Sequence, residues 1–287
     1  MNSRIFCRDV CLDRGEPMVG AGAAAPRYAL LHWPRAKWRV PRHLSMGMPE
    51  SLTEAMLAAN VAGINVTLVD GDEIALSCGD EILPRASLPE VAAALERLAD
   101  GRGLGGRKDR RITILCCTDG KQDPCCAKFG NATWKRLRDL ADPSVFRVLQ
   151  STHIGGCRFA ASLLVLRDRA RYGRLDPDQV AHFLAALQRA EVYLPCYRGN
   201  PLLTGPAQVA EHAALSHARK TGQAARVVLE EVRIAETEAE FIATLPEARL
   251  KIRLTPDTFA VNTRCRTLED GPDGSVTRWQ VAALEAL

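Results

Sequence analysis

The fold is decided around residues 111–126, which read RITILCCTDGKQDPCC. The apolar residues of Arg111–Leu115 predict a buried strand, and the polar residues after Cys117 predict a loop. Asp123 suits the N-cap of a helix and Pro124 its first position, where a missing N–H costs nothing. A strand, a loop and a helix follow one another here, as they do in an α/β domain.

Cysteine is concentrated in this stretch and in a second one, residues 153–157, which read HIGGC. Cys125 and Cys126 lie in the first turn of the predicted helix, where free backbone N–H groups and the helix dipole favour thiolate. The two glycines of the second stretch let the backbone turn tightly and approach a metal closely. Ten cysteines in a chain whose first residues lack the apolar core of a signal peptide are more typical of ligands or catalysts than of disulfides.

Each cysteine doublet leaves a choice of ligand. Residues 116 and 117 point to opposite sides of the predicted strand, so we expect only one of them to bind a metal. The pairs Cys116/Cys125 and Cys117/Cys126 have equal spacing. Spacing alone therefore leaves both pairs open.

The composition limits the classes of function. Of 287 residues, 47% are hydrophobic and 25% charged, which is typical of a soluble globular protein long enough for two domains. The net charge of +4 is spread along the chain, so nucleic acid is not expected as a partner, although a local basic face could dock an acidic protein. No apolar run approaches the roughly 18–20 residues that span a bilayer, and we expect a cytoplasmic chain with no membrane association.

Before the first cysteine stretch, the sequence predicts an α/β unit over residues 1–107 with the order β-α-β-β-α. The turn residues Asp70-Gly71-Asp72 predict a hairpin between its second and third strands, and Ser51 is expected to cap its first helix. Residues 101–107 are rich in glycine and arginine and predict a linker. The expected strands are Arg27–Trp33, Ile64–Val69 and Glu73–Ser77, and the expected helices are Leu52–Ala62 and Leu88–Leu98.

Residues 108–204 nearly repeat this order, which is that of a thioredoxin-like α/β domain. We therefore expect two such units in tandem, the first without metal ligands. Residues 205–287 differ and predict an α+β region with a small antiparallel sheet, in which Arg249–Leu254 and Phe259–Thr263 are separate strands. The elements expected in 108–204 are strands at Arg111–Leu115, Val145–Leu149, Ser162–Leu166 and Tyr172–Leu175, and helices at Cys125–Ala141 and Asp178–Arg189.

The two cysteine stretches resemble those of the sucrase/ferredoxin-like family. The matching motifs are CTDGKQDPCCAKFG at residues 117–130 and STHIGGCRFA at residues 151–160, followed by Tyr172-Gly173-Arg174 and Tyr197-Arg198-Gly199. This resemblance implies a thioredoxin-like ferredoxin fold that holds one 2Fe–2S cluster.

The resemblance also implies a ligand set. The first ligand precedes Thr-x-Gly in the family motif, which assigns Cys117 and Cys126, and the other two ligands are His153 and Cys157. Some members carry histidine at both ends of the last segment, so Cys157 predicts three cysteine ligands and one histidine. A neutral imidazole in place of one thiolate makes the cluster less anionic, so we expect a reduction potential between those of plant-type ferredoxins and Rieske centres.

We therefore expect a cytoplasmic electron-transfer protein, and no residue is assigned a catalytic role. The chain lacks a dinucleotide-binding fingerprint, so its electrons are expected from a redox partner protein. Two alternatives remain: a reductase component acting on a small substrate such as a ferric chelate, or a structural zinc-binding module, which a Cys3His set also suits. Arg158, directly after Cys157, and Arg198 each have two interpretations: a cation that raises the potential, or an arginine paired with a carboxylate.

Overall fold

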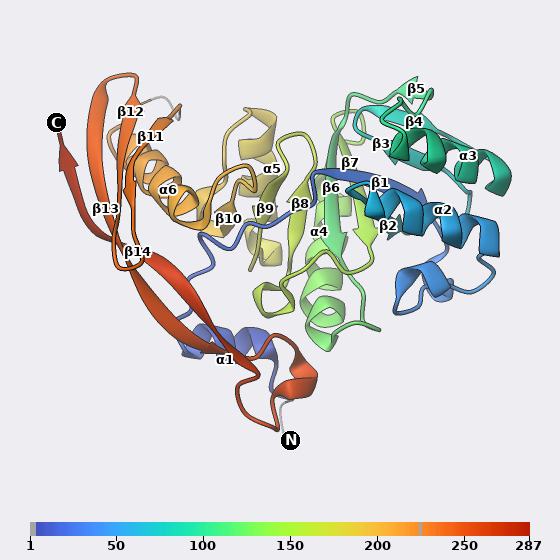
Figure 1. The fold of residues 1–287 in the computed structure, drawn as a ribbon, viewed down its shortest axis with the longest axis horizontal. Coiled ribbons are helices and arrows are strands. Elements are labelled where there is room, and N and C mark those ends of the chain that lie inside the picture. The colour runs from blue at the N-terminus through green and yellow to red at the C-terminus, as the bar shows by residue number, and fades with distance from the viewer. Residues whose placement is uncertain (1–3, 224–225) are drawn as a thin grey trace. The chain divides into compact units, whose positions relative to one another are not determined.

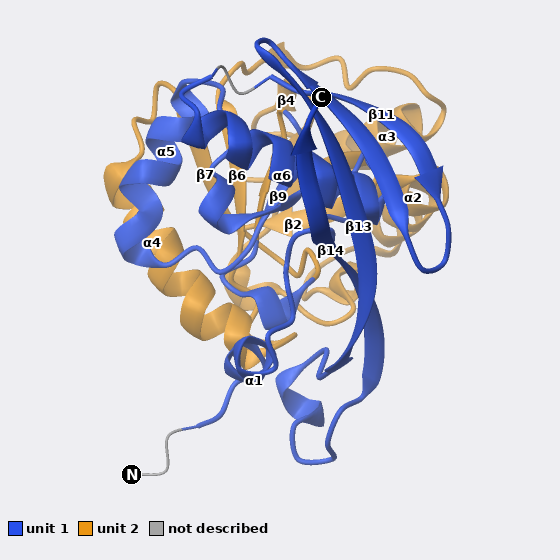
Figure 2. Cartoon of the chain, turned by 90° about the vertical axis from the view of Figure 1, so that its left-hand side faces the viewer, with its two compact units in different colours: residues 1–23, 156–162, 168–287 blue, residues 24–155, 163–167 orange. Residues whose placement is uncertain are grey.

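A computed structural model describes residues 4–223 and 226–287 of the chain. These residues form two compact units that interleave in sequence (Figure 2). Unit 1 comprises Met1–Ala23, Gly156–Ser162 and Asp168–Leu287, and unit 2 comprises Ala24–Gly155 and Leu163–Arg167. The domain boundaries expected after residues 107 and 204 stay predictions. None of the described helices is long and apolar enough to cross a membrane.

Unit 2 is built on a mixed sheet whose strands lie in the order β8-β6-β7-β2-β1-β3-β4-β5 (Figure 1). β6 and β7 are parallel, as are β1 and β2, and the two pairs meet where β2 and β7 run antiparallel. All of β6 is buried, as expected of a central strand with a continuous apolar run. The strands are β1 Arg27–His32, β2 Ile64–Val69, β3 Leu76–Cys78, β4 Glu81–Leu83, β5 Arg107–Lys108, β6 Ile112–Cys117, β7 Phe146–Ser151 and β8 Leu163–Val165.

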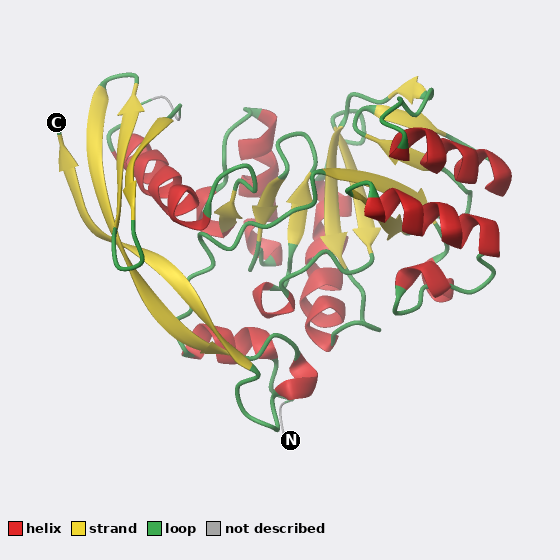
Figure 3. Cartoon of the chain, viewed as in Figure 1, coloured by secondary structure: helices red, strands yellow, loops and turns green. Residues whose placement is uncertain are grey.

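Two helices of unit 2, α2 (Glu50–Val61) and α3 (Leu88–Ala99), pack against each other and on the β1–β2 part of the sheet (Figure 3). The elements of the predicted order β-α-β-β-α are present as β1, α2, β2, β3 and α3, but β4 lies between β3 and α3 and a helix at Cys7–Asp13 precedes β1. The N-cap predicted at Ser51 is wrong: the N-cap of α2 is Pro49, and the helix begins at Glu50, one residue before Ser51. A π-helical segment, Cys126–Gly130, leads into α4, Asn131–Leu140, so the helix predicted after Pro124 is also present.

The hairpin predicted at Asp70-Gly71-Asp72 is wrong. β1 lies between β2 and β3, parallel to the first and antiparallel to the second. The reason is burial: residues 28–31 of β1 are apolar and fully enclosed, which a central position allows and an edge position does not. The actual hairpin joins β3 to β4 through Gly79 and Asp80, and Gly79 has the positive φ of +60° that a two-residue turn requires.

Unit 1 ends in a four-stranded antiparallel sheet, β11-β12-β13-β14, with α6 packed on one face (Figure 1). Small residues of α6, such as Ala210 and Ala214, meet Phe241 and Ile252 of the sheet. The predicted α+β region with a small antiparallel sheet is confirmed. The helices and strands of unit 1 are α1 Cys7–Asp13, β9 Ala170–Tyr172, α5 Val180–Gln188, β10 Tyr197–Gly199, α6 Gly205–Lys220, β11 Val228–Ile234, β12 Ala239–Leu245, β13 Ala248–Val261 and β14 Gly274–Ala286.

The two strands predicted at 249–254 and 259–263 are in fact one, because β13 continues through Pro256. Pairing with β12 stops at Leu254, and beyond it β13 pairs only with β14. Proline cannot donate to a sheet and is tolerated where one edge of the strand is free. Pro256 lies in the part of β13 that pairs with β14 alone, which is a place where a strand accommodates proline.

Candidate metal centre

Three of the four predicted ligands lie together in unit 2. The ligand atoms of Cys117, Cys126 and His153 are all within 4.8 Å of one another. Cys117 is the last residue of β6, Cys126 opens the π-helical segment, and His153 follows β7 by two residues. β6 and β7 are parallel and pair Cys117 with Ser151, so Cys117 and His153, which follows β7, lie at the same edge of the sheet. Both thiols are buried and the imidazole is half-buried.

The surroundings of Cys117 favour its thiolate. A hydrogen bond from Cys126 lowers the pKa of Cys117, burial opposes this, and hydrogen bonding and charge from His153 add to the lowering. The backbone N–H of Asp119 also donates to the sulfur. The pKa of Cys117 therefore lies well below its usual value. A thiolate is the form that binds a metal.

The other member of each doublet has a different environment. The Cys116 thiol donates to the carbonyl oxygen of Gly130 at 3.5 Å, and burial, with the charge of Cys117, raises its pKa. Cys125 is buried too. Its N–H donates to the Asp123 carboxylate at 2.8 Å, which is the hydrogen bond that a side chain at the N-cap is expected to accept. Among the described residues, the group formed with His153 contains neither Cys116 nor Cys125. Which doublet members bind a metal stays a prediction.

The side chain of Asp119 positions His153 by binding the backbone of that histidine. Its carboxylate accepts a hydrogen bond from the N–H of His153 at 3.2 Å. Burial and the charge of Cys117 raise the pKa of Asp119. The residue therefore ties the loop after β6 to the loop after β7, which holds two ligand-bearing segments in register.

Three cations of unit 2 contact the backbone of these loops or of the turn beside them, and the sequence had indicated Lys121 but neither Arg35 nor Arg42. Arg42 donates to the carbonyl oxygen of His153 at 3.2 Å, and Arg35 donates to that of Thr118 at 3.2 Å. Lys121 donates to the carbonyl oxygens of Ala36, at 3.2 Å, and of Trp38. The arginines lie in short 3-10 turns about 110 and 80 residues before their partners. No local spacing could have found them.

The fourth predicted ligand, Cys157, belongs to unit 1 and is not in the group of three. It is buried and begins a short 3-10 turn, Cys157–Phe159. Gly155 and Gly156 precede it with φ of +93° and +80°. The tight turn expected from the two glycines is therefore present, and the role of Cys157 as a ligand stays a prediction.

Comparison with known proteins locates these residues in a family motif. The model of the sucrase/ferredoxin-like family matches residues 29–199, which is more than half of the chain and includes all four predicted ligands. No curated protein matches the chain.

Two similar solved structures are thioredoxin-like [2Fe-2S] ferredoxins from Aquifex aeolicus. The first is 14% identical, covers 31% of this chain and 90% of its own, and has a TM-score of 0.28. The second, a wild-type protein, is 15% identical, covers 31% of this chain and 96% of its own, and has a TM-score of 0.28.

Proposed function

This chain belongs to the sucrase/ferredoxin-like family, and on that premise we propose that it is an electron-transfer protein holding one 2Fe–2S cluster on Cys117, Cys126, His153 and Cys157. When bound, the cluster supplies one-electron chemistry. The chain supplies the ligands, their burial and a docking surface.

The observation that carries the proposal is the convergence of two thiols and one imidazole from three separate segments within 4.8 Å. These donors fit the group, because thiolates are the standard ligands of iron–sulfur clusters and histidine replaces cysteine in some of them. The lowered pKa of Cys117 supports the same conclusion, since a carboxylate-rich or neutral pocket would not stabilise a thiolate at this depth.

Cys157 completes the set in this proposal. A 2Fe–2S cluster takes four protein ligands, and the group in unit 2 provides three. Cys157 is four residues beyond His153 on the same loop, and such a segment spans at most about 14 Å when extended. A short segment of this kind allows the Cys157 sulfur to join the other three, and the positive φ of both glycines supports a loop that folds back.

We propose a redox protein with an acidic surface as the electron partner. Lys121 is exposed, and its side chain binds the carbonyl oxygens of Ala36 and Trp38, in and directly after the turn Arg35–Lys37, in which Lys37 is exposed and Arg35 half-buried. These cations lie over the loop that bears Cys117. A positive surface beside the ligands would steer an acidic protein and speed its association.

The test is metal and sulfide analysis of the anaerobically purified full chain, with an EPR spectrum after reduction by dithionite. We expect about two iron and two acid-labile sulfide per chain, and a signal from the reduced cluster whose g-values differ from those of an all-cysteine 2Fe–2S centre. A colourless protein that contains zinc and no iron would exclude the proposal and support a structural zinc site instead.

A further inference from the structure

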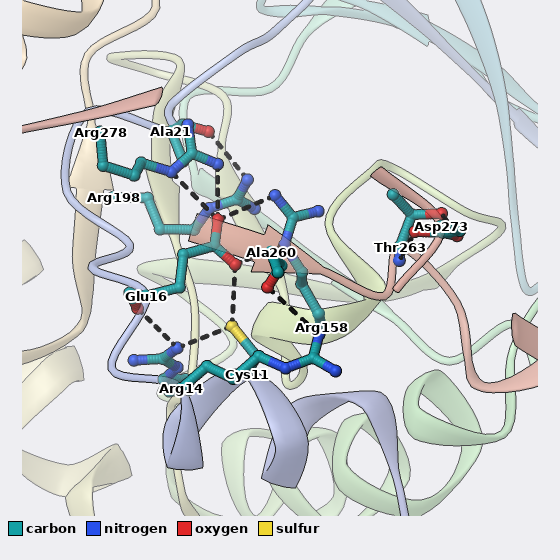
Figure 4. Close-up of polar contacts among 11 residues, drawn as sticks. Cys11, Arg14, Glu16, Ala21, Arg158, Arg198, Ala260, Thr263, Asp273 and Arg278 are labelled. Carbon is teal, nitrogen blue, oxygen red and sulfur yellow. Dashed lines mark hydrogen bonds and ion pairs between the residues drawn. The ribbon is translucent and has the colours of Figure 1, made fainter. Parts of the chain in front are cut away.

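Glu16 of unit 1 lies at the centre of a cluster of arginines that are buried or half-buried (Figure 4). Its side chain is 1% exposed and accepts hydrogen bonds from Arg158 at 2.7 and 2.9 Å and from Arg278 at 3.0 and 2.7 Å. Burial raises the pKa of Glu16, but the hydrogen bonds from Arg158, Cys11 and Arg278 outweigh it and leave the pKa below its usual value. For Arg158, the interpretation as a carboxylate-paired arginine is confirmed.

Two further guanidinium groups join this cluster without a carboxylate of their own. Arg174 donates to the Cys11 sulfur and to the Glu16 carbonyl oxygen, both at 3.1 Å. Arg198 donates to the Ser162 hydroxyl at 3.2 Å and to the Ala21 carbonyl oxygen at 2.8 Å. In the described part of the chain, the Nε atoms of both arginines have no hydrogen-bond partner. Four guanidinium groups thus gather around one carboxylate.

Arg198 is the most deeply buried of these cations, at 4% exposed. Its guanidinium lies 4.7 Å from the centroid of the Phe159 ring, close enough for a cation–π attraction. Burial lowers the pKa of Arg198, and repulsion from Arg171, Arg158 and Arg278 lowers it further. A buried, unpaired charge costs several kcal/mol, so this part of the fold has too few anions for its cations.

The same guanidinium lies against the residue that precedes Cys157. A methyl group built on Gly156 would meet the two terminal nitrogens of Arg198 at 2.7 and 2.9 Å. One built on Gly173 would meet the Arg198 Cδ at 2.8 Å. A larger residue at either position would therefore displace the Arg198 side chain from this place. Neighbouring Cα atoms are about 3.8 Å apart, so the bonds from Gly156 through the Cys157 sulfur keep Arg198 within about 13 Å of any metal bound to Cys157.

We propose that Arg198 is the buried counter-cation of the cluster and raises its reduction potential; this inference rests on the proposed function. A 2Fe–2S core with three thiolates is a monoanion when oxidised and a dianion when reduced. Reduction adds one electron from the partner protein, with no bond made or broken and no proton required. The fixed cation attracts the dianion more strongly than the monoanion, so it favours the reduced form.

The test is a spectroelectrochemical titration of the cluster-loaded full chain and three variants. For Arg198→Gln, at a fixed potential, we expect the ratio of reduced to oxidised cluster to fall about tenfold, which corresponds to about 59 mV for a one-electron couple. Glu16→Gln removes the only carboxylate of the arginine cluster and should shift the ratio in the opposite direction. Arg253→Gln removes an exposed cation of β13 and should leave the ratio unchanged.

A fall smaller than about fivefold in Arg198→Gln, or a rise, would overturn the inference. If that variant does not retain the cluster, Arg198→Lys and Glu16→Gln decide: the first keeps the charge and should keep the potential, and the second should raise it. Iron and sulfide analysis of the unchanged chain comes first. A chain without iron refutes the proposed function, whereas a loaded chain with an unshifted Arg198 variant refutes only the role of Arg198.

Discussion

The approach of the π-helical segment to β6 depends on Gly130, and Gly130→Ala should disrupt it. A methyl group built at Gly130 would overlap the carbonyl oxygen of Cys117 and lie 3.1 Å from its carbonyl carbon. Both atoms are backbone, so no rotamer change relieves the clash. Overpacking of this kind costs up to about 3 kcal/mol, and the higher helix propensity of alanine returns about 1 kcal/mol. We therefore expect a net loss of about 2 kcal/mol in the free energy of unfolding.

The same substitution tests the geometry of the ligands. Separation of the two segments would move Cys126 away from Cys117, so the variant should also bind less iron. The assay is urea denaturation of the metal-free chain together with iron analysis after cluster reconstitution. Gly205→Ala in α6 is the matched control, because its methyl group would lie 3.4 Å from the nearest atom, an ordinary contact. Wild-type stability and iron content in Gly130→Ala would refute the packing argument.

Three further predictions concern the ligand register, a titrating core residue and a helix cap. Cys117→Ser should abolish the visible absorption of the reconstituted chain, whereas Cys116→Ser should retain it because that thiol is protonated and bound to backbone; the reverse result would assign the ligand to Cys116. Burial and the neighbouring Arg147 lower the pKa of His32 from 6.5 to about 4. Between these two pH values the unfolded chain binds more protons than the folded chain. The free energy of unfolding should therefore fall as the pH drops from about 6.5 to 4, by up to about 3 kcal/mol. Denaturation at several pH values checks this, and His32→Gln should lose the dependence if the reasoning holds. Ser87→Ala removes the capping box that Ser87 forms with Glu90 at the start of α3, and it should lower the free energy of unfolding by about 1 kcal/mol. Urea denaturation measures this change, and an unchanged denaturation midpoint would mean that the cap does not contribute to stability.

Local features of the metal centre were predictable from the sequence. The strand before Cys117, the helix after Pro124 and the turn at Gly155-Gly156 are each specified by residues adjacent in the chain. An apolar run, a capping carboxylate and glycines with positive φ act over a few residues, so their pattern is visible without a fold. The small C-terminal sheet followed from alternation for the same reason.

The order of the strands was decided by tertiary structure. The turn residues after β2 predicted a hairpin, yet β1 lies between β2 and β3 because its apolar residues require a central position. Local turn preference is worth little against the burial of a whole strand. In the same way the sequence predicted separate strands at 249–254 and 259–263, and only the fold shows that β13 continues past the end of its pairing with β12.

The electrostatics of the protein were also decided by tertiary structure alone. The sequence predicted Cys117 and His153 as partners from a motif, but not that Arg42 binds the backbone of that histidine. It also left Arg158 and Arg198 with the same two interpretations. The fold separates them: Arg158 binds Glu16, while Arg198 is buried beside Gly156 without a carboxylate. Charge pairing depends on distance in space, and these residues are brought together only after the chain has folded.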